Sequence, residues 1–281
     1  MKLASTSELV KKYKLHTNKA LGQNFIFDEN FTDKIVASAG NLDDASVLEI
    51  GPGPGSLTRS ILKTKIRKLI VVEKDERCLP ILTEIQKFYP QNLEIINQDA
   101  LKIAETELFD CKFKIIANLP YNVGTALIFK WLENIENIIS MHTMLQKEVA
   151  ERIVATTGQK NYCRLSANVN LLCKTRLLFL VNKNVFTPPP KVTSAIVEFI
   201  PRNHQELSEI SGGLYFHDKF SLKKYQLVVG TAFNQPRKMI RQSLKTLHPC
   251  IAEIIDNTGL NATLRAENLS IADFCKISIN I

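Results

Sequence analysis

Short apolar runs of strand type alternate with longer runs of helical spacing over the first two-thirds of the chain, and this alternation constrains the fold more than any other feature. Strands are expected at residues 45–50, 69–72, 93–96, 113–117, 143–145, 177–181 and 195–200. Helices are expected at residues 56–64, 79–88 and 124–132. Strands that alternate with helices in this way form βαβ units. We therefore predict an α/β fold built on a mostly parallel sheet.

The alternation of strands and helices stops after about residue 201, which predicts two domains, 1–203 and 204–281. The polar, turn-rich stretch 204–213 is interpreted as a linker. Helices without intervening strands are expected at residues 219–233, 237–247 and 250–257. Positive charge concentrates in this second, smaller, all-helical domain, at Lys223, Lys224, Arg237, Lys238, Arg241 and Lys245.

The charge balance and the cysteines narrow the class of protein. A formal net charge of +8 favours a polyanionic partner, either nucleic acid or an acidic membrane face, although a solvated basic face would account for it equally well. The six cysteines form no C-x-x-C pair, so no metal site is expected. We expect them to be the reduced thiols of a cytoplasmic protein. The polar start does not resemble a signal peptide, and no apolar stretch approaches the roughly 18 residues of a membrane span. We expect no membrane association.

A glycine turn, Leu48–Gly55, follows the first of these strands and opens a helix. Its spacing is G-x-G-x-G, which differs from the dinucleotide fingerprint G-x-G-x-x-G. Glu73 and Asp99 end the second and third strands, where a carboxylate can accept hydrogen bonds from ribose hydroxyls and from an adenine amine, respectively. The turn alone could be a structural corner, and each carboxylate a surface charge or helix cap. In this order they favour a nucleoside cofactor without a pyrophosphate, which points to S-adenosylmethionine.

The segment Asn118–Tyr121, of sequence Asn-Leu-Pro-Tyr, ends the fourth strand. An exocyclic adenine amine is a poor nucleophile because its lone pair is delocalised into the ring. The side-chain oxygen of Asn118 and the backbone carbonyl of Leu119 can accept its hydrogens, and Pro120 stiffens the turn so that both oxygens stay aimed. Tyr121 can stack on the base. The alternative is an Asx-type turn with a buried tyrosine.

With these motifs in place, the chain resembles the ribosomal RNA adenine dimethyltransferase family over nearly its whole length. The segment Leu21–Asp28 is similar to the family's G-Q-N-F-L-x-D, which implies that Asn24 and the backbone of Ile26 contact the cofactor. The resemblance also carries over Gly51 as a cofactor-binding position, Glu73 as the ribose ligand and Asp99 as the adenine ligand. It makes Asn118 common to the cofactor and substrate sites. The fold it implies is a Rossmann-like S-adenosylmethionine-dependent methyltransferase sheet with a small helical domain.

A third similar segment is Val185–Val192, of sequence Val-Phe-Thr-Pro-Pro-Pro-Lys-Val. Its prolines form a stiff, extended loop, and the resemblance implies that Phe186 stacks on the target adenine opposite Tyr121. The alternative is a hydrophobic plug beside a proline turn whose prolines resemble a partner-binding motif. The loop leads directly into the strand expected at residues 192–199, which favours the first interpretation.

Departures from the family concentrate in the second domain. Phe233–Lys238 resembles the family's F-x-Q-R-R-K, but Pro236 stands where an arginine is usual. The family's phosphate contact at this position does not carry over, and the proline disfavours a regular helix there. Arg265–Ser270 also matches the family pattern. A basic second domain favours the small-subunit branch over the antibiotic-resistance branch that methylates large-subunit RNA.

The expected function is therefore methyl transfer from S-adenosylmethionine to N6 of two adjacent adenines near the 3′ end of small-subunit (16S) ribosomal RNA. The product is N6,N6-dimethyladenine, formed during 30S subunit biogenesis by a monomer whose residues 204–281 bind RNA. The partners implied are this RNA and the 30S particle, and the target base must leave its stack. The alternatives are an adenine N6-methyltransferase acting on large-subunit RNA or on DNA, and a ribosome-assembly or RNA-binding factor with dispensable catalysis.

Overall fold

The computed structural model of the chain describes residues 3–18 and 22–281, and the chain divides into two compact units. The first unit comprises Met1–Ala150 and Arg176–Pro201, and the second comprises Glu151–Thr175 and Arg202–Ile281. The predicted division at residue 203 thus lies close to the last crossing of the chain between units. The prediction kept residues 151–175 in the first domain, whereas the structure groups them with the second unit.

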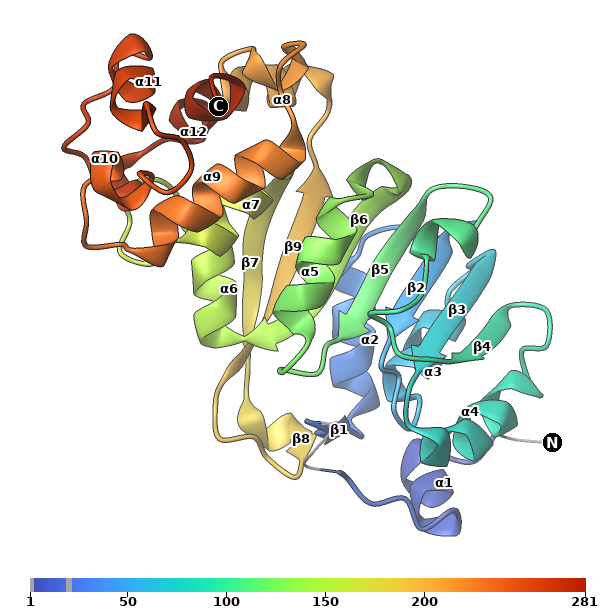
Figure 1. Cartoon of the computed structure of the whole chain (residues 1–281). Coiled ribbons are helices and arrows are strands. Elements are labelled where there is room, and N and C mark those ends of the chain that lie inside the picture. The colour runs from blue at the N-terminus through green and yellow to red at the C-terminus, as the bar shows by residue number, and fades with distance from the viewer. Residues whose placement is uncertain (1–2, 19–21) are drawn as a thin grey trace. The chain divides into compact units, whose positions relative to one another are not determined.

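The first unit is built on a seven-stranded sheet of order β4-β3-β2-β5-β6-β9-β7, which confirms the predicted α/β class (Figure 1). Strands β4, β3, β2, β5 and β6 are parallel, and β9 runs antiparallel to β6. Two further short strands, β1 and β8, form a separate antiparallel ribbon. The strands are β1 (Phe25–Ile26), β2 (Ser46–Ile50), β3 (Lys68–Glu73), β4 (Leu93–Asn97), β5 (Phe113–Asn118), β6 (Ile138–Gln146), β7 (Cys173–Val181), β8 (Phe186–Thr187) and β9 (Ser194–Pro201).

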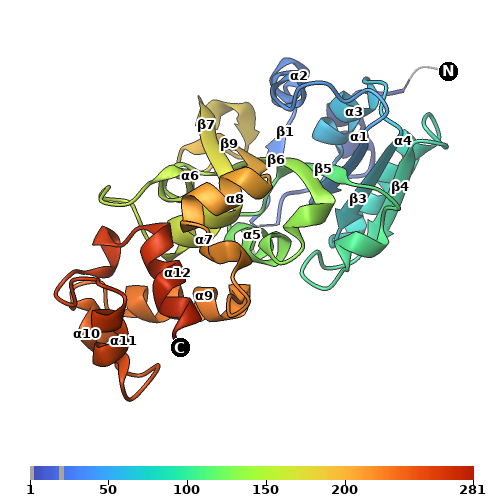
Figure 2. The same cartoon turned by 90° about the horizontal axis from the view of Figure 1, so that it is seen from above.

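Helices cover both faces of the central strands, as their composition requires. Every residue of β2 is buried, including Ser46 and Glu49, because a central parallel strand is covered by helices on both faces. Figure 2 shows α2 and α3 on one side of the sheet and α5 on the other. The helices that lie wholly within this unit are α1 (Thr6–Lys12), α2 (Glu29–Ser38), α3 (Ser56–Leu62), α4 (Leu79–Gln86) and α5 (Gly124–Leu132).

The corner between β2 and α3 requires glycine. Gly51, Gly53 and Gly55 all have positive φ angles, of 67°, 55° and 82°. A Cβ atom on Gly55 would lie 2.5 Å from Cδ1 of Ile85 on α4, so this position also lacks room for a side chain. Both the backbone conformation and the packing against α4 therefore require glycine at residue 55.

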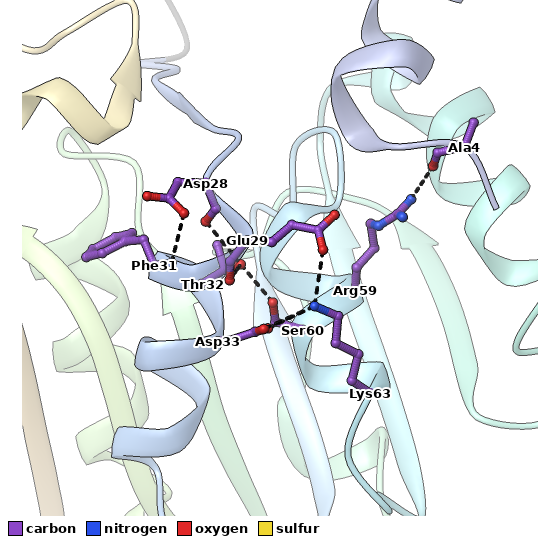
Figure 3. A network of polar contacts seen from close by, with 9 residues as sticks. All are labelled: Ala4, Asp28, Glu29, Phe31, Thr32, Asp33, Arg59, Ser60 and Lys63. Atoms are coloured by element: carbon purple, nitrogen blue, oxygen red, sulfur yellow. Dashed lines mark hydrogen bonds and ion pairs between the residues drawn. The ribbon is translucent and has the colours of Figure 1, made fainter. Parts of the chain in front are cut away.

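A network of polar contacts joins α2 to α3 (Figure 3). The buried hydroxyls of Thr32 and Ser60 lie 2.7 Å apart, and Lys63 pairs with both Glu29 and Asp33. Helix α2 begins three residues after β1, and α3 begins directly after the glycine turn. The network therefore holds the chain around β1 in place relative to that turn.

The second unit is helical, and its centre is α9 (Leu222–Asn234). Tyr225 on α9 is fully buried, and its hydroxyl donates to the carbonyl of Ala167 at 3.0 Å. This contact explains why residues 151–175 belong to the second unit. Its other helices are α7 (Arg164–Leu172), α8 (His204–Ser211), α10 (Ile240–Ser243), α11 (Ile251–Asn257) and α12 (Ile271–Ile279), while α6 (Lys147–Val154) spans the first crossing of the chain between units.

Two predictions about this unit were wrong. The stretch 204–213 is mostly helix α8 rather than a linker, because Asn203 and Glu206 form a capping box and Gly212 ends the helix in a left-handed conformation. The helix predicted at residues 237–247 is reduced to α10, because Met239 pairs with Arg265 in an isolated antiparallel bridge. Helix α9 ends at Asn234, two residues before Pro236, as proline disfavours helical geometry before it.

Replacing Gly55 with alanine should destabilise the first unit more than the same change at Gly40. Both residues have positive φ, which costs alanine about 1–2 kcal/mol, but nothing lies within 4 Å of a Cβ at Gly40. The clash with Ile85 should add about 1–3 kcal/mol to the cost of Gly55→Ala. Urea unfolding followed by the fluorescence of Trp131, the single tryptophan, measures both, and equal losses would contradict the packing argument.

Candidate functional site

One pocket of the first unit gathers every site residue that the sequence predicted. Its lining includes the glycine turn, residues 22–26, the ends of β3 and β5 and the start of β8. The predicted residues found there are Asn24, Ile26, Gly51, Glu73, Asp99, Asn118, Leu119, Pro120, Tyr121 and Phe186. Leu21, the first residue of the similar N-terminal segment, lies outside the described residues. The pocket forms at the carboxyl edge of the sheet, where parallel α/β sheets bind ligands.

Glu73 ties the glycine turn to the end of β3. Its carboxylate accepts hydrogen bonds from the backbone amides of Gly53, at 2.9 Å, and Asp75, at 2.8 Å. The side chain is only 6% exposed, and burial raises its pKa. Each oxygen keeps a lone pair after these bonds, so the carboxylate can still accept from a pair of hydroxyl groups.

Asp99 is more open and is held by a neighbouring cation. Lys74 donates to Oδ2 of Asp99 at 2.8 Å, and the backbone amide of Leu101 donates to Oδ1 at 3.1 Å. The hydrogen bond from Lys74 is the largest cause of the lowered pKa of Asp99. The carboxylate therefore stays ionised at neutral pH, and it can accept a further bond from an amine that enters the pocket.

The Asn-Leu-Pro-Tyr turn at the end of β5 packs directly against the glycine turn. A Cβ on Gly51 would lie 3.5 Å from Cδ of Pro120. The carbonyl of Pro120 accepts from the amides of Val123 and Gly124, which leads the turn into α5. In the described part of the chain, the side-chain amide of Asn118 and the carbonyl of Leu119 make no hydrogen bond. Two oxygen acceptors without a hydrogen-bond partner thus belong to residues that line the pocket, of which Leu119 is 1% exposed.

Two aromatic rings line the same pocket. Tyr121 is half-buried, and its hydroxyl lies 2.6 Å from that of Ser194, the first residue of β9. Burial raises the pKa of Tyr121, so its hydroxyl stays protonated. Phe186 is 2% exposed and packs on the wall of the pocket. The structure brings both rings to one site, and their stacking on a base stays a prediction.

The β1–β8 ribbon links the predicted cofactor segment to the loop that carries Phe186. Ile26 pairs with Phe186, and Phe25 pairs with Thr187. The hydroxyl of Ser56, at the start of α3, donates to the carbonyl of Ile26. That carbonyl keeps one lone pair for the backbone contact that the family resemblance implies. The ribbon is thereby anchored to the helix that follows the glycine turn.

The sequence-based reasoning missed several groups that support the pocket. Ser56, Lys74 and Ser194 hold Ile26, Asp99 and Tyr121 in place, and only Lys74 adjoins a predicted site residue in sequence. Glu49 is 1% exposed and accepts from the hydroxyl of Thr58 at 2.7 Å. Burial, helped by the charge of Glu73, raises the pKa of Glu49 to about 8. The signal for Glu49 was present, because it stands two residues before Gly51.

Other expectations concern metals, thiols and membranes. All six cysteines are free. Across residues 3–18 and 22–281, no three His, Cys, Asp or Glu side chains converge as metal ligands would. None of the helices in the described part of the chain has the length and apolar character needed to span a bilayer.

Comparisons with known proteins cover almost the whole chain. The profile of the ribosomal RNA adenine dimethylase family matches residues 14–281. A ribosomal RNA small subunit methyltransferase A from Ruegeria is 43% identical over 274 residues, which cover 96% of this chain and 94% of the relative. Its counterpart from Afipia carboxidovorans is 44% identical over 272 residues, covering 95% and 92%.

Solved structures show the same fold. A dimethyladenosine transferase from Plasmodium falciparum superposes with a TM-score of 0.74 at 27% identity, covering 90% of this chain and 95% of that one. The 23S rRNA methyltransferase ErmE superposes with a TM-score of 0.65 at 24% identity, covering 92% and 99%. At that identity the second likeness shows the fold alone.

Replacing Glu49 with glutamine should flatten the pH dependence of stability. The pKa of Glu49 is raised to about 8 in the folded protein, so between its ordinary value and about 8 the folded state binds more protons than the unfolded state. Stability contributed at low pH is therefore lost as pH rises, by at most about 1.4 kcal/mol per pH unit. Urea unfolding between about pH 5 and about pH 8 should show a smaller loss in Glu49→Gln. Parallel losses in both proteins would refute a protonated Glu49.

Proposed function

Because the chain belongs to the ribosomal RNA adenine dimethylase family, we propose that its pocket transfers methyl groups from S-adenosylmethionine to adenine N6 in small-subunit ribosomal RNA. The target would be two adjacent adenines near the 3′ end, each converted to N6,N6-dimethyladenine. The observation that carries this proposal is the packing of the Asn118–Tyr121 turn on the glycine turn. This packing supports a site in which two oxygen acceptors without partners lie beside the cofactor-type corner.

The groups lining the pocket suit the cofactor. Glu73 keeps acceptor capacity for two ribose hydroxyls, and Asp99 keeps acceptor capacity for the adenine amine. The glycines at the corner let the backbone approach the ligand closely, and Asn24 adds an amide beside them. S-adenosylmethionine, when bound, supplies an electrophilic methyl group on a sulfonium sulfur.

The chain's own groups orient the target amine. The side-chain oxygen of Asn118 and the carbonyl of Leu119 accept its two hydrogens, which draws electron density toward the nitrogen as it becomes pyramidal. The backbone of the turn, and with it the carbonyl of Leu119, is held before the reaction, since Pro120 restricts the backbone and its carbonyl accepts hydrogen bonds from the start of α5. The rings of Tyr121 and Phe186 hold the base flat. The nitrogen gives up its proton to solvent after it has bonded to the methyl carbon, so no residue needs to act as a base beforehand.

The second unit supplies the surface for RNA. Lys223, Lys224, Arg237, Lys238, Arg241 and Lys245 are all exposed there. Contacts from these cations to phosphates release counterions, so RNA affinity should fall steeply as salt rises. We propose that the natural substrate is a 30S particle in assembly, bound by a cytoplasmic monomer with no membrane partner.

The rival functions are less well supported. The relatives at 43% and 44% identity are named for the small ribosomal subunit, which favours that RNA over large-subunit RNA. A factor that had lost catalysis would have no need to keep Asn118 and Leu119 open to the pocket. Binding of small subunits by an inactive variant would reveal an additional role in assembly.

Replacing Asn118 with alanine should lower methyl transfer about 100-fold or more, because it removes an acceptor aimed at the reacting amine. Asn118→Asp, which keeps an oxygen at the same place, should retain more activity than Asn118→Ala. Release of labelled methyl onto undermethylated small subunits measures turnover, and calorimetry with S-adenosylmethionine checks the site. Wild-type turnover in Asn118→Ala would reject the acceptor role.

Replacing Asp99 with alanine should weaken binding of S-adenosylmethionine about tenfold or more, as expected for loss of a charged acceptor. The exposed Asp43 offers a control, because Asp43→Ala removes the same charge outside the pocket. Isothermal calorimetry compares the two. Equal affinities in Asp99→Ala and Asp43→Ala would remove Asp99 from the cofactor site.

A further inference from the structure

The second unit contains its own pocket, of about 310 Å³. Val154, Ile210 and Ile271 form its apolar part, and Tyr162, Lys174 and Arg202 bring polar groups to its walls. Every lining residue belongs to the second unit. The size and the mixture of apolar walls with a few polar groups are typical of small-ligand sites.

Arg202 is the cation that this pocket holds in place. Its backbone amide donates to the carbonyl of Leu172 at 2.8 Å, and its Nε donates to the carbonyl of Asn170 at 3.0 Å. Within residues 3–18 and 22–281, the two terminal nitrogens of the guanidinium have no hydrogen-bond partner and no ion pair. The residue is half-buried, and burial lowers its pKa. A guanidinium that is partly desolvated and has its terminal nitrogens unpaired favours an oxyanion that can accept two parallel hydrogen bonds, such as a phosphate.

The support beneath Arg202 is rigid. The side-chain nitrogen of Asn170 donates to the carbonyl of Ala155 at 2.9 Å, and its oxygen accepts from the hydroxyl of Thr175 at 3.0 Å. Asn170 is buried, and both the nitrogen and the oxygen of its side-chain amide are hydrogen-bonded. The carbonyl that orients Arg202 therefore belongs to a residue that cannot easily move.

Acidic groups near the pocket are largely occupied elsewhere. Glu206 bonds Lys174 at 2.6 Å through one oxygen and caps α8 through the other, at the amide of Asn203. Glu206 and Glu209 both raise the pKa of Arg202, but neither forms an ion pair with it. Lys174 holds Glu206, and Glu209 acts on Arg202 without forming an ion pair with it, so no carboxylate occupies the terminal nitrogens of the guanidinium.

Tyr162 adds a second polar group that lacks a close partner. The residue is 5% exposed, and in the part of the chain described its hydroxyl makes no hydrogen bond of good geometry. Burial raises the pKa of Tyr162, and the nearby side chain of Thr157 opposes this rise. The ring itself is held edge-on by Phe233 at 5.8 Å between centroids.

We propose that this pocket takes one unstacked nucleotide of the substrate RNA, with a phosphate on Arg202 and the base against Val154, Ile210 and Ile271. The proposal rests on the proposed function for its choice of RNA as the polyanion. Specific RNA recognition commonly targets bases that have left the stack, and such a nucleotide combines a planar apolar surface with an anion. The pocket offers apolar walls for the base and the guanidinium of Arg202 for the phosphate.

Three variants of the full-length protein test the pocket. Arg202→Gln removes the charge, Ile210→Trp fills the apolar part and keeps the charge, and Lys276→Gln is a control that removes one exposed charge outside the pocket. Filter binding to undermethylated small subunits should show roughly tenfold weaker affinity for both pocket variants, with near-wild-type affinity for the control. The salt dependence of Arg202→Gln should lose about 0.7–0.9 of a unit of slope. Affinity for S-adenosylmethionine should stay unchanged in all three.

A photocrosslink separates this proposal from the proposed function. Small subunits whose RNA carries 4-thiouridine should crosslink to peptides containing Tyr162 or Ile271 in the wild type, and much less in Ile210→Trp. Absence of methyl transfer by the wild type would refute the proposed function and leave this readout intact. If Arg202→Gln does not fold, as judged by circular dichroism, Ile210→Trp and the crosslink decide.

A second titration distinguishes a nucleotide that is part of the RNA from a free nucleotide. Calorimetry with adenosine monophosphate and with inorganic phosphate should show only weak, millimolar binding, because an isolated nucleotide lacks the rest of the RNA. Tight binding of either one that is lost in Arg202→Gln, together with unchanged affinity for small subunits, would overturn the proposal in favour of a free-nucleotide site. Unchanged RNA affinity in both pocket variants would overturn it as well.

Discussion

The site depends on the contact between two turns, where Pro120 packs on the backbone of Gly51. Parallel pairing of β2 with β5 brings their carboxyl ends to the same edge of the sheet, and the turns that follow must then meet. A Cβ atom on Gly51 would lie 3.5 Å from Cδ of Pro120, which is an ordinary contact distance, so it is the positive φ of Gly51 that disfavours a side chain there. The oxygens of Asn118 and Leu119 therefore reach the cofactor corner because two backbones approach closely.

The remaining groups of the pocket are held by contacts that converge on the same corner. Glu73 binds the amide of Gly53, which joins β3 to the turn, and Ser56 binds the carbonyl of Ile26, which joins the ribbon to α3. Phe186 reaches the pocket through its pairing with Ile26. A ligand that orders residues 22–26 would thus also order the aromatic wall.

Periodicity along the sequence was enough to predict the central strands, and the site residues that the motifs indicated line one pocket. Gly124–Leu132 is a helix with the predicted bounds, and Asn118 ends a strand as expected, because both patterns are local. Features that rest on distant contacts were missed. The bridge between Met239 and Arg265 breaks a helix that local spacing favoured, and the bond from Tyr225 to Ala167 draws residues 151–175 into the second unit. Helix α8 was local and could have been found, since Asn203 and Glu206 spell a capping box.

Mapping the methylated nucleotides would test the central claim most directly. The purified protein is incubated with labelled S-adenosylmethionine and small ribosomal subunits that lack these methyl groups, and the RNA is digested and sequenced by mass spectrometry. The proposed function predicts label on N6 of two adjacent adenines near the 3′ end, with two methyl groups on each. Label on a ring nitrogen, on another base or on large-subunit RNA alone, or no label at all, would contradict the account.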